Sequence, residues 1–218
     1  MPKKKLAIFD LDGTLLNTID DLGHAANYAL KRHGLPTHEI SSYPMYVGNG
    51  VARLLERVLP GSHRRKDVIE SLLVDFKSYY NDHNTDFTAP YPGIPELLDE
   101  LKAAGVSIAV ASNKYQQATE KIISHFFPHI DFVAVEGQRE GVPVKPDPSV
   151  VFAILFKTKS LKADTIYIGD SGIDMETARR ACVDSIGVTW GFRSEKELSD
   201  SHAGTIVHSA SEILPLII

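Results

Sequence analysis

Four short polar segments of this sequence carry residue types that could do chemistry. They are Asp10–Thr14 (DLDGT), Ser112–Asn113, Lys145–Pro146 and Gly169–Asp174 (GDSGID). The first, second and fourth directly follow apolar runs, and the third lies in a predicted loop. In open α/β sheets the ligand binds where the parallel strands end. If the apolar runs are such strands, the segments bring carboxylates, a hydroxyl and an ammonium to one edge.

These groups together favour phosphoryl transfer. Close carboxylates cannot all stay ionised without a compensating charge, and Mg²⁺ commonly takes one or two carboxylates plus substrate phosphate. Mn²⁺ also suits oxygen ligands. Lys145 adds a point charge and Ser112 a hydroxyl, which suit a phosphoryl group. Gly13 and the turn amides after Asp10 could form a concave nest of N–H groups for the same oxygens.

Each residue also has a simpler structural interpretation. Asp10 and Asp12 fit an ordinary turn, because Asp-x-Asp-Gly favours turns. Ser112 could cap the following helix, and Lys145 could be a solvated surface lysine. Asp174 could complete a capping box three residues after a serine. The ordered occurrence of all four segments favours the functional interpretation.

The elements that must position these groups alternate between strand and helix. Five apolar runs are typical of buried parallel strands: Leu6–Phe9, Val106–Ala111, Phe132–Val135, Thr165–Ile168 and Ile186–Thr189. Between them we expect a helix that begins near Pro95, one over Tyr115–Phe126 and one after Asp147–Pro148. This alternation predicts an α/β fold with a doubly wound parallel sheet.

One interval breaks the alternation. Between Leu16 and about Phe87 the patterns are helical, with helices expected after Thr18, over Val51–Leu59 and over Val68–Tyr80. Roughly seventy residues without a strand exceed an ordinary crossover between parallel strands. We therefore expect an inserted helical subdomain over residues 17–87, and an α/β core domain formed by residues 1–16 and 88–218.

Composition narrows the class of protein. The 218 residues carry a net charge of −5, which argues against a nucleic-acid-binding or basic membrane-surface protein. No apolar run approaches the roughly 20 residues that span a bilayer, and the N-terminus lacks a signal-type apolar region. The single cysteine is compatible with a reducing compartment. We expect a cytoplasmic protein with no nucleic-acid or membrane partner.

The four segments, in this order, resemble motifs one to four of the haloacid dehalogenase-like hydrolase superfamily. The resemblance covers the whole chain, and the helical insert after the first motif resembles that superfamily's C1-type cap. It implies a Rossmann-like core and a Mg²⁺-dependent phosphatase. The second carboxylate, at Asp12, and the acidic fourth motif distinguish the chain from true dehalogenases, which need no metal.

The resemblance also implies a role for each residue. Asp10 would be the nucleophile that forms an aspartyl phosphate, and Asp12 the general acid and base. Lys145 would hold nucleophile and phosphate together. Phosphate and substrate would be bound by Gly13, Thr14, Ser112 and Asn113. The metal would be bound by Asp10, the Asp12 carbonyl, Asp170 and, through water, Asp174.

Within the superfamily, DLDGTLLNTIDDL, PYPGIPELLDELKAAGV and SNK are similar to phosphoglycolate phosphatases. Ser171–Gly172 stands where that group often has Thr–Pro. The segment Val47–Arg53 resembles the group's specificity loop, which implies that Asn49 and Arg53 meet the non-phosphate end of a small substrate. Arg53 could equally be a solvated helix residue.

The expected partner is a small phosphorylated metabolite, with 2-phosphoglycolate as the leading candidate, and the expected assembly is a monomer or weak dimer. Two other enzymes stay open: a β-phosphoglucomutase-type phosphosugar mutase and an inorganic pyrophosphatase. A non-enzymatic alternative is a phosphoacceptor switch that resembles a receiver domain. The helical insert, and an acid two residues after the nucleophile, count against the switch.

Overall fold

The core of the protein is a six-stranded parallel sheet. The structure, a computed structural model, describes residues 4–218. The strands run in the order β5-β4-β1-β6-β7-β8. Their bounds are Leu6–Phe9 (β1), Ser107–Tyr115 (β4), Ala134–Gln138 (β5), Thr165–Gly169 (β6), Asp184–Val188 (β7) and Thr205–Val207 (β8). The predicted doubly wound sheet is confirmed. The sequence analysis missed β8 because three residues at a sheet edge carry too little pattern.

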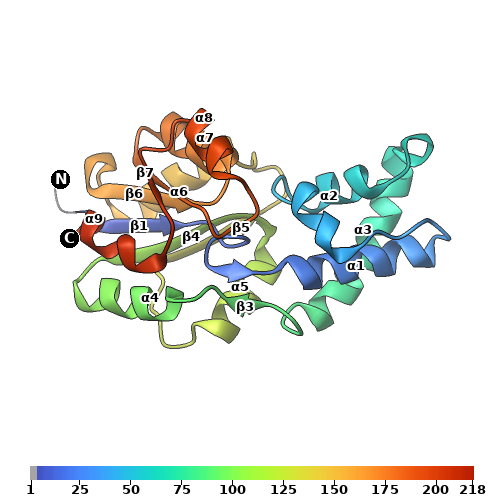
Figure 1. Cartoon of the computed structure of the whole chain (residues 1–218), viewed down its shortest axis with the longest axis horizontal. Helices are drawn as coiled ribbons and strands as arrows, with labels where there is room; N and C mark the ends of the chain where they lie inside the picture. Colours follow the sequence, from blue (N-terminus) through green and yellow to red (C-terminus); the bar gives the residue numbers. More distant parts are fainter. Residues whose placement is uncertain (1–3) are drawn as a thin grey trace. The chain divides into compact units, whose positions relative to one another are not determined.

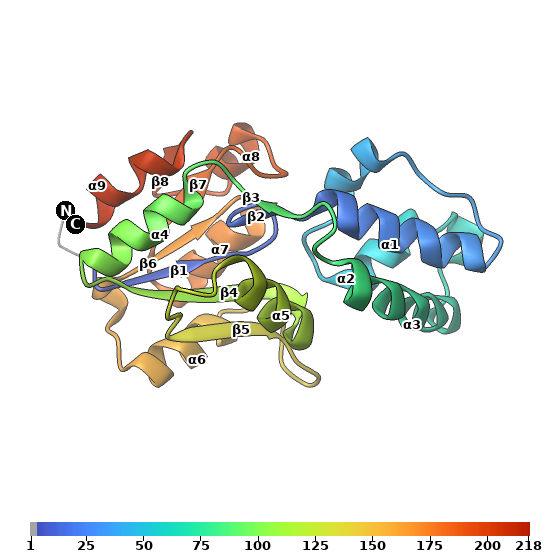
Figure 2. The ribbon, with the colours of Figure 1, turned by 90° about the horizontal axis from the view of Figure 1, so that it is seen from below.

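Helices cover both faces of this sheet (Figures 1 and 2). One face carries α4 (Ile94–Ala103) and α5 (Gln116–Phe126), and the other carries α6 (Ser149–Thr158), α7 (Gly172–Ala181) and α8 (Glu195–Asp200). The strand order explains this division. The chain first adds β4 and β5 on one side of β1 and then crosses to β6, β7 and β8 on the other side. Because connections between parallel strands are right-handed, the helices of these two halves lie on opposite faces of the sheet. The core is completed by η3 (Lys162–Asp164), η4 (Ala210–Glu212) and α9 (Leu214–Ile217).

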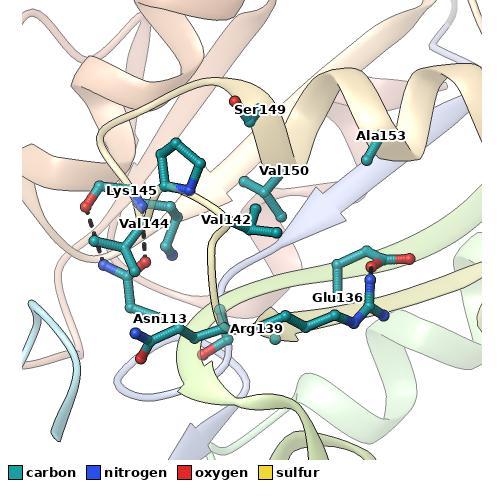
Figure 3. A pocket seen from close by; sticks show the side chains of 13 residues that line it. Asn113, Glu136, Arg139, Val142, Val144, Lys145, Ser149, Val150 and Ala153 are labelled. Atoms are coloured by element: carbon teal, nitrogen blue, oxygen red, sulfur yellow. Dashed lines mark hydrogen bonds and ion pairs between the residues drawn. The ribbon is translucent and has the colours of Figure 1, made fainter.

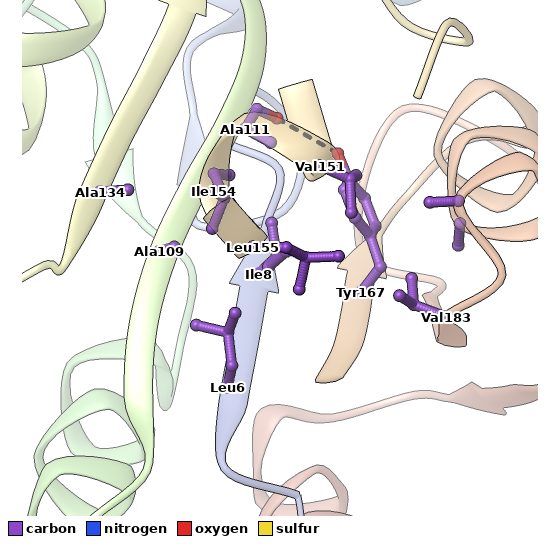
Figure 4. Close-up of a cluster of buried hydrophobic side chains, with 12 residues drawn as sticks. Leu6, Ile8, Ala109, Ala111, Ala134, Val151, Ile154, Leu155, Tyr167 and Val183 are labelled. Carbon is purple, nitrogen blue, oxygen red and sulfur yellow. Dashed lines mark hydrogen bonds between the residues drawn. The ribbon is translucent and has the colours of Figure 1, made fainter. Parts of the chain in front are cut away.

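Apolar packing fixes the α6 and α7 face. Side chains from β1, β4, β5 and β6 pack there against Val151, Ile154 and Leu155 of α6 and Ala178 of α7 (Figure 4). Tyr167 of β6 lies fully buried in this cluster, and its hydroxyl donates to the carbonyl of Ala111 at 3.2 Å. Burial of the phenol is tolerated because its polar end has a partner. The cluster therefore ties β6 to the end of β4.

Strand β4 contains an irregularity where it reaches the carboxyl edge. Ala111 pairs with Glu136 and Tyr115 with Gln138, so three residues of β4 face one residue of β5. The residue opposite is Gly137, and a Cβ there would lie 2.7 Å from the carbonyl oxygen of Lys114. Glycine thus lets the backbone approach closely, as a bulge requires. The bulge turns residues 112–114 out of the regular ladder.

The chain divides into two compact units: residues up to Asn17 together with Pro90–Ile218, and the segment Thr18–Ala89. The second unit is helical. It contains α1 (Ile19–Arg32), η1 (Ile40–Met45), α2 (Val51–Val58), η2 (Gly61–His63) and α3 (Lys66–His83). Two-residue strands β2 (Leu16–Asn17) and β3 (Ala89–Pro90) pair where the chain passes between the units.

Within the helical unit, α1 packs against α3 and η1. The carboxylate of Asp21, buried on α1, accepts hydrogen bonds from the Phe87 and Thr88 amides and from the Thr88 hydroxyl. These bonds join the first helix of the unit to its last residues. Among residues 4–218, no helix is both long and apolar enough to cross a membrane.

Candidate active site

Lys145 is the centre of the cluster at the carboxyl edge of the sheet. Its Nζ lies 2.8 Å from Oδ1 of Asp10 and 2.8 Å from Oδ1 of Asp174. The same ammonium donates to the carbonyl of Ala111 at 2.9 Å and to the hydroxyl of Tyr167 at 3.0 Å. The lysine side chain is 3% exposed, so it is not a solvated surface lysine.

The charges in this cluster perturb one another. Burial raises the pKa of Asp10, Asp174 raises it further, and Lys145 lowers it without cancelling the effect. Burial alone would lower the pKa of Lys145, but the carboxylates of Asp10 and Asp174 outweigh it and raise the pKa well above its ordinary value. The carboxylates thus stabilise Lys145 as an ammonium, and its charge offsets only part of the effect of burial on Asp10.

Asp10 follows β1 directly, and its amide donates to the Ile168 carbonyl of β6 at 2.9 Å. Its Oδ1 accepts from the Leu11 amide at 2.7 Å as well as from Lys145. Two donors thus fix one carboxylate oxygen. This arrangement orients the other oxygen of Asp10 and holds the carboxylate as a rigid group.

Asp170 follows β6 and is also buried. Its Oδ2 accepts from the Phe192 amide at 2.7 Å. Burial raises its pKa to about 7, assisted by the charge of Asp174 and opposed by the Phe192 N–H group. Glycine is needed at positions 13 and 191, because a Cβ at either would overlap the Asp170 carboxylate. The two glycines leave the space that this side chain occupies.

The turn after Asp10 differs in detail from the sequence expectation. The Gly13 amide donates to the Leu16 carbonyl at 2.9 Å and the Thr14 amide to the Leu11 carbonyl at 3.3 Å. Both N–H groups therefore donate to carbonyl oxygens within the turn, and they do not form the expected concave nest for phosphate oxygens. The Thr14 hydroxyl lies 3.5 Å from Oδ1 of Asp170. Gly13, at a φ of 88°, contributes space beside Asp170 instead.

Asp174 combines two roles. Ser171 and Asp174 form a reciprocal capping box at the start of α7, as the sequence indicates. The Ser171 hydroxyl donates to Oδ2 of Asp174 at 2.6 Å, while Oδ1 faces Lys145. The predicted capping box is confirmed, and it leaves one oxygen of Asp174 in contact with Lys145. The helix cap fixes the carboxylate that the lysine binds.

Ser112 and Asn113 lie in the β4 bulge. Ser112 does not cap α5, which begins at Gln116; its hydroxyl accepts from the Lys114 amide at 3.2 Å. The Asn113 amide group joins two segments, because its oxygen accepts from the Lys145 amide at 2.8 Å and its nitrogen donates to the Lys145 carbonyl at 3.1 Å. Asn113 therefore holds the backbone of the catalytic-lysine candidate.

Sequence reasoning missed one charged residue of the site. Nζ of Lys114 lies 2.9 Å from Oδ1 and 3.0 Å from Oδ2 of Asp12. The lysine side chain is 3% exposed and the aspartate side chain 15%. The sequence places this lysine directly after Ser112–Asn113, at the end of a predicted strand, but indicates no partner for it. The bulge, which the apolar pattern of β4 does not reveal, turns it toward the carboxylate.

A small cavity of about 130 Å³ lies beside these segments (Figure 3). Ser112, Asn113 and Lys145 line it, and Glu136 and Arg139 line it from β5 and the following loop. Arg139 pairs with Glu136 at 2.8 Å. The cavity lies next to the candidate phosphate-binding groups, and it is also lined by Val142, Val144 and Val150.

The carboxylates suit a hard divalent cation. Asp10, Asp170 and Asp174 each offer an oxygen, and these three oxygens lie within 4.8 Å of one another. All three residues are buried, and Lys145 compensates only part of their charge. Because oxygen donors of this kind match Mg²⁺, the residues present fit the metal that the sequence predicts.

The two other predicted binding residues lie in the helical unit. The Asn49 side-chain oxygen accepts a hydrogen bond from Arg57 at 2.5 Å, and Arg57 also donates to the Tyr46 carbonyl at 2.8 Å. Arg53 pairs with Glu56 on the same helix, and its side chain is 65% exposed. The arginine at 57 thus braces the loop that carries Asn49.

Comparison with known proteins assigns the chain to a family. The family model described as haloacid dehalogenase-like hydrolase matches residues 7–188. A phosphoglycolate phosphatase from Vibrio parahaemolyticus is 31% identical over 98% of this chain and 96% of its own length. One from Aquifex aeolicus is 32% identical over 86% of each chain. The chain belongs to the haloacid dehalogenase-like hydrolases, as its four motifs indicate.

Solved structures agree with this assignment. A candidate phosphoglycolate phosphatase from Lactobacillus delbrueckii subsp. bulgaricus superposes with a TM-score of 0.93, at 32% identity over 99% of both chains. A predicted phosphoglycolate phosphatase from Haemophilus somnus gives a TM-score of 0.90, at 27% identity over the whole of both chains. The predicted Rossmann-like core of this family is confirmed.

Proposed function

We propose that this hydrolase is a Mg²⁺-dependent phosphatase that cleaves a small phosphomonoester, with 2-phosphoglycolate as its substrate. The observation that carries the proposal is the contact of one buried lysine, Lys145, with the carboxylates of Asp10 and Asp174 at the carboxyl edge of the sheet. The relatives named as phosphoglycolate phosphatases support the choice of substrate.

In the proposed reaction, Asp10 attacks the phosphorus atom with the carboxylate oxygen that Leu11 and Lys145 leave unfixed. The new bond joins this oxygen to phosphorus, and the ester bond to the leaving oxygen breaks. Asp12 gives its proton to the leaving oxygen. Asp12 then takes a proton from the water that attacks the aspartyl phosphate, so that inorganic phosphate and free Asp10 result.

Lys145 would bind a phosphoryl oxygen while it holds Asp10. Its three N–H donors already serve Asp10, Asp174, the Ala111 carbonyl and the Tyr167 hydroxyl, so the phosphoryl oxygen would replace one of the other acceptors. The Ser112 hydroxyl and Thr14 are the further phosphate ligands that we propose. Asn113 acts through the Lys145 backbone, and Gly13 by leaving space for Asp170. Transition-state charge on the phosphoryl oxygens would thus meet fixed donors, which stabilise it more than mobile water does.

Asp10, Asp170 and the backbone carbonyl of Asp12 would hold Mg²⁺. Both oxygens of Asp174 already accept hydrogen bonds, which favours a role for Asp174 through a metal-bound water. When bound, the cation would supply positive charge that offsets the carboxylates and would polarise the phosphate oxygens. Mn²⁺ could serve in its place.

We also propose that the helical unit, predicted over residues 17–87, acts as the cap, and that Asn49 and Arg53 contact the non-phosphate end of the substrate. The Arg57 brace of the Asn49 loop supports this, since a recognition loop needs a defined conformation. A cap that closes would exclude water during catalysis. The further expectations are a cytoplasmic location and a monomer or weak dimer.

Product analysis separates this proposal from the alternatives. Purified protein is incubated with 2-phosphoglycolate, glucose 1-phosphate and pyrophosphate, each with Mg²⁺. We expect free phosphate and glycolate from the first. An isomerised sugar phosphate would identify a mutase, and preferred cleavage of pyrophosphate a pyrophosphatase. A long-lived phosphorylated Asp10 without steady turnover would identify a phosphoacceptor switch.

A further inference from the structure

We infer that Lys114 recognises the carboxylate of the substrate, and that this lysine selects phosphate esters whose leaving group carries a carboxylate next to the ester oxygen. The inference rests on the proposed function, in which Asp12 contacts the leaving oxygen. The sequence analysis expects substrate selectivity to come from the helical unit. If the inference holds, part of that selectivity comes from a residue of the α/β core.

The first observation is the position of the ammonium. Nζ of Lys114 contacts both oxygens of Asp12, at 2.9 Å and 3.0 Å. A general acid must touch the leaving oxygen, so the lysine lies beside the leaving group and not beside the phosphoryl group, which Lys145 serves. In 2-phosphoglycolate, a single methylene carbon separates the ester oxygen from the carboxylate. The substrate's second charge therefore falls near this ammonium.

The second observation is that the lysine is held in place. Its side chain is almost fully buried, its amide donates to the Ser112 hydroxyl, and its carbonyl accepts from the Thr119 hydroxyl at 3.2 Å. Gly137 provides the space for this backbone. A long lysine side chain usually loses much conformational freedom on binding, but here folding has already restricted it.

The third observation concerns charge. Once Asp12 has given its proton to the leaving oxygen, the carboxylate of the leaving group would lie beside a like charge, which is unfavourable. The ammonium of Lys114 offsets that charge and adds a charge-assisted hydrogen bond. A neutral leaving group gains neither effect. The pair thus converts a site that would repel carboxylates into one that prefers them.

The test compares two substrates that differ in this charge: 2-phosphoglycolate and 2-hydroxyethyl phosphate. For each, kcat/KM is measured in the wild type, Lys114→Gln and Lys114→Arg. Because a charge-assisted hydrogen bond contributes about 1.5–3 kcal/mol, we expect the preference for 2-phosphoglycolate to fall about 10- to 100-fold in Lys114→Gln. Lys114→Arg keeps the charge and should keep a larger preference.

A matched control is Lys4→Gln. Lys4 is another buried lysine, 2% exposed and paired with Asp184 at 2.5 Å, but at the opposite end of the sheet. Its loss should leave the preference unchanged. Circular dichroism and thermal unfolding establish that each variant is folded, and Lys114→Arg keeps the test decisive if Lys114→Gln does not fold.

Three outcomes are informative. A preference that collapses in Lys114→Gln and persists in Lys114→Arg supports the inference. Equal losses on both substrates, with an unchanged preference, would mean that Lys114 only positions Asp12, which overturns the inference and leaves the proposed function standing. A wild type that does not prefer 2-phosphoglycolate overturns the proposed substrate and the inference together.

Discussion

The Nζ of Lys145 lies 2.8 Å from Oδ1 of Asp10, and both side chains are almost fully buried. The lysine comes from a loop before α6 and the aspartate from the end of β1, so the contact joins residues 135 positions apart in the sequence. The same ammonium binds Asp174 of α7. One charge thus organises three segments of the site.

Replacing this charge should affect both stability and activity. In Lys145→Met, Asp10 and Asp174 lose their counter-charge, and breaking a buried ion pair in this way costs about 3–5 kcal/mol. We expect a lower free energy of unfolding in urea, and a fall in kcat on the order of 100-fold or more from the lost electrostatic stabilisation. The surface pair Lys196–Asp200 provides the control, since Lys196→Met should change neither quantity measurably. Wild-type stability in Lys145→Met would contradict the account.

The pH dependence of the metal-free protein follows from Asp170. Its pKa is raised to about 7, whereas an aspartate in an unfolded chain titrates near about 4. Between these values the folded state keeps a proton that the unfolded state has released. Stability of the metal-free protein should therefore fall as pH rises from about 4 to about 7, by up to about 1.4 kcal/mol per pH unit from this group.

Mg²⁺ should reverse this trend, because it binds the ionised carboxylates. We expect Mg²⁺ affinity to fall below pH 7 and binding near pH 6 to release protons, both measurable by calorimetry in buffers of different ionisation enthalpy. Asp170→Asn should flatten the pH dependence of the metal-free protein. A metal-free stability that rises between pH 5 and pH 7 would show that the sign is wrong.

The bulge in β4 can be tested through Gly137. A Cβ at this position would lie 2.7 Å from the Lys114 carbonyl oxygen and 2.7 Å from the Thr119 hydroxyl, so Gly137→Ala must displace the bulge. We expect a loss of about 1–3 kcal/mol in the free energy of unfolding, together with a reduced kcat. Gly61→Ala is the matched control, since nothing lies within 4 Å of a Cβ there. Equal behaviour of the two variants would contradict this role.

Most of the fold and much of the site can be predicted from the sequence, for identifiable reasons. Buried strands such as Leu6–Phe9 are continuous apolar runs, and the residues that follow them mark the carboxyl edge. The apolar pattern alone therefore assigns Asp10 and Asp170 to one edge of the sheet. The capping box at Ser171 is also local, since its two partners are three residues apart.

Features that depend on tertiary contacts were harder to predict. Strand β4 runs to Tyr115, beyond the predicted end at Ala111, because a bulge continues it past its apolar part. The sequence shows no reason for Lys114 to be buried, since its partner Asp12 is 102 residues away. Likewise, only the fold reveals that the Asn113 side chain binds the Lys145 backbone.

The most direct test of the central claim is phosphate release from 2-phosphoglycolate by the wild type and by Asp10→Asn, with Mg²⁺ and with the metal removed by chelation. Asp10→Asn keeps the size of the side chain but replaces the attacking carboxylate. We predict metal-dependent release by the wild type, and no release by the folded variant under either condition. An Asp10→Asn protein that hydrolyses the ester at the wild-type rate would contradict the assignment of Asp10 as nucleophile.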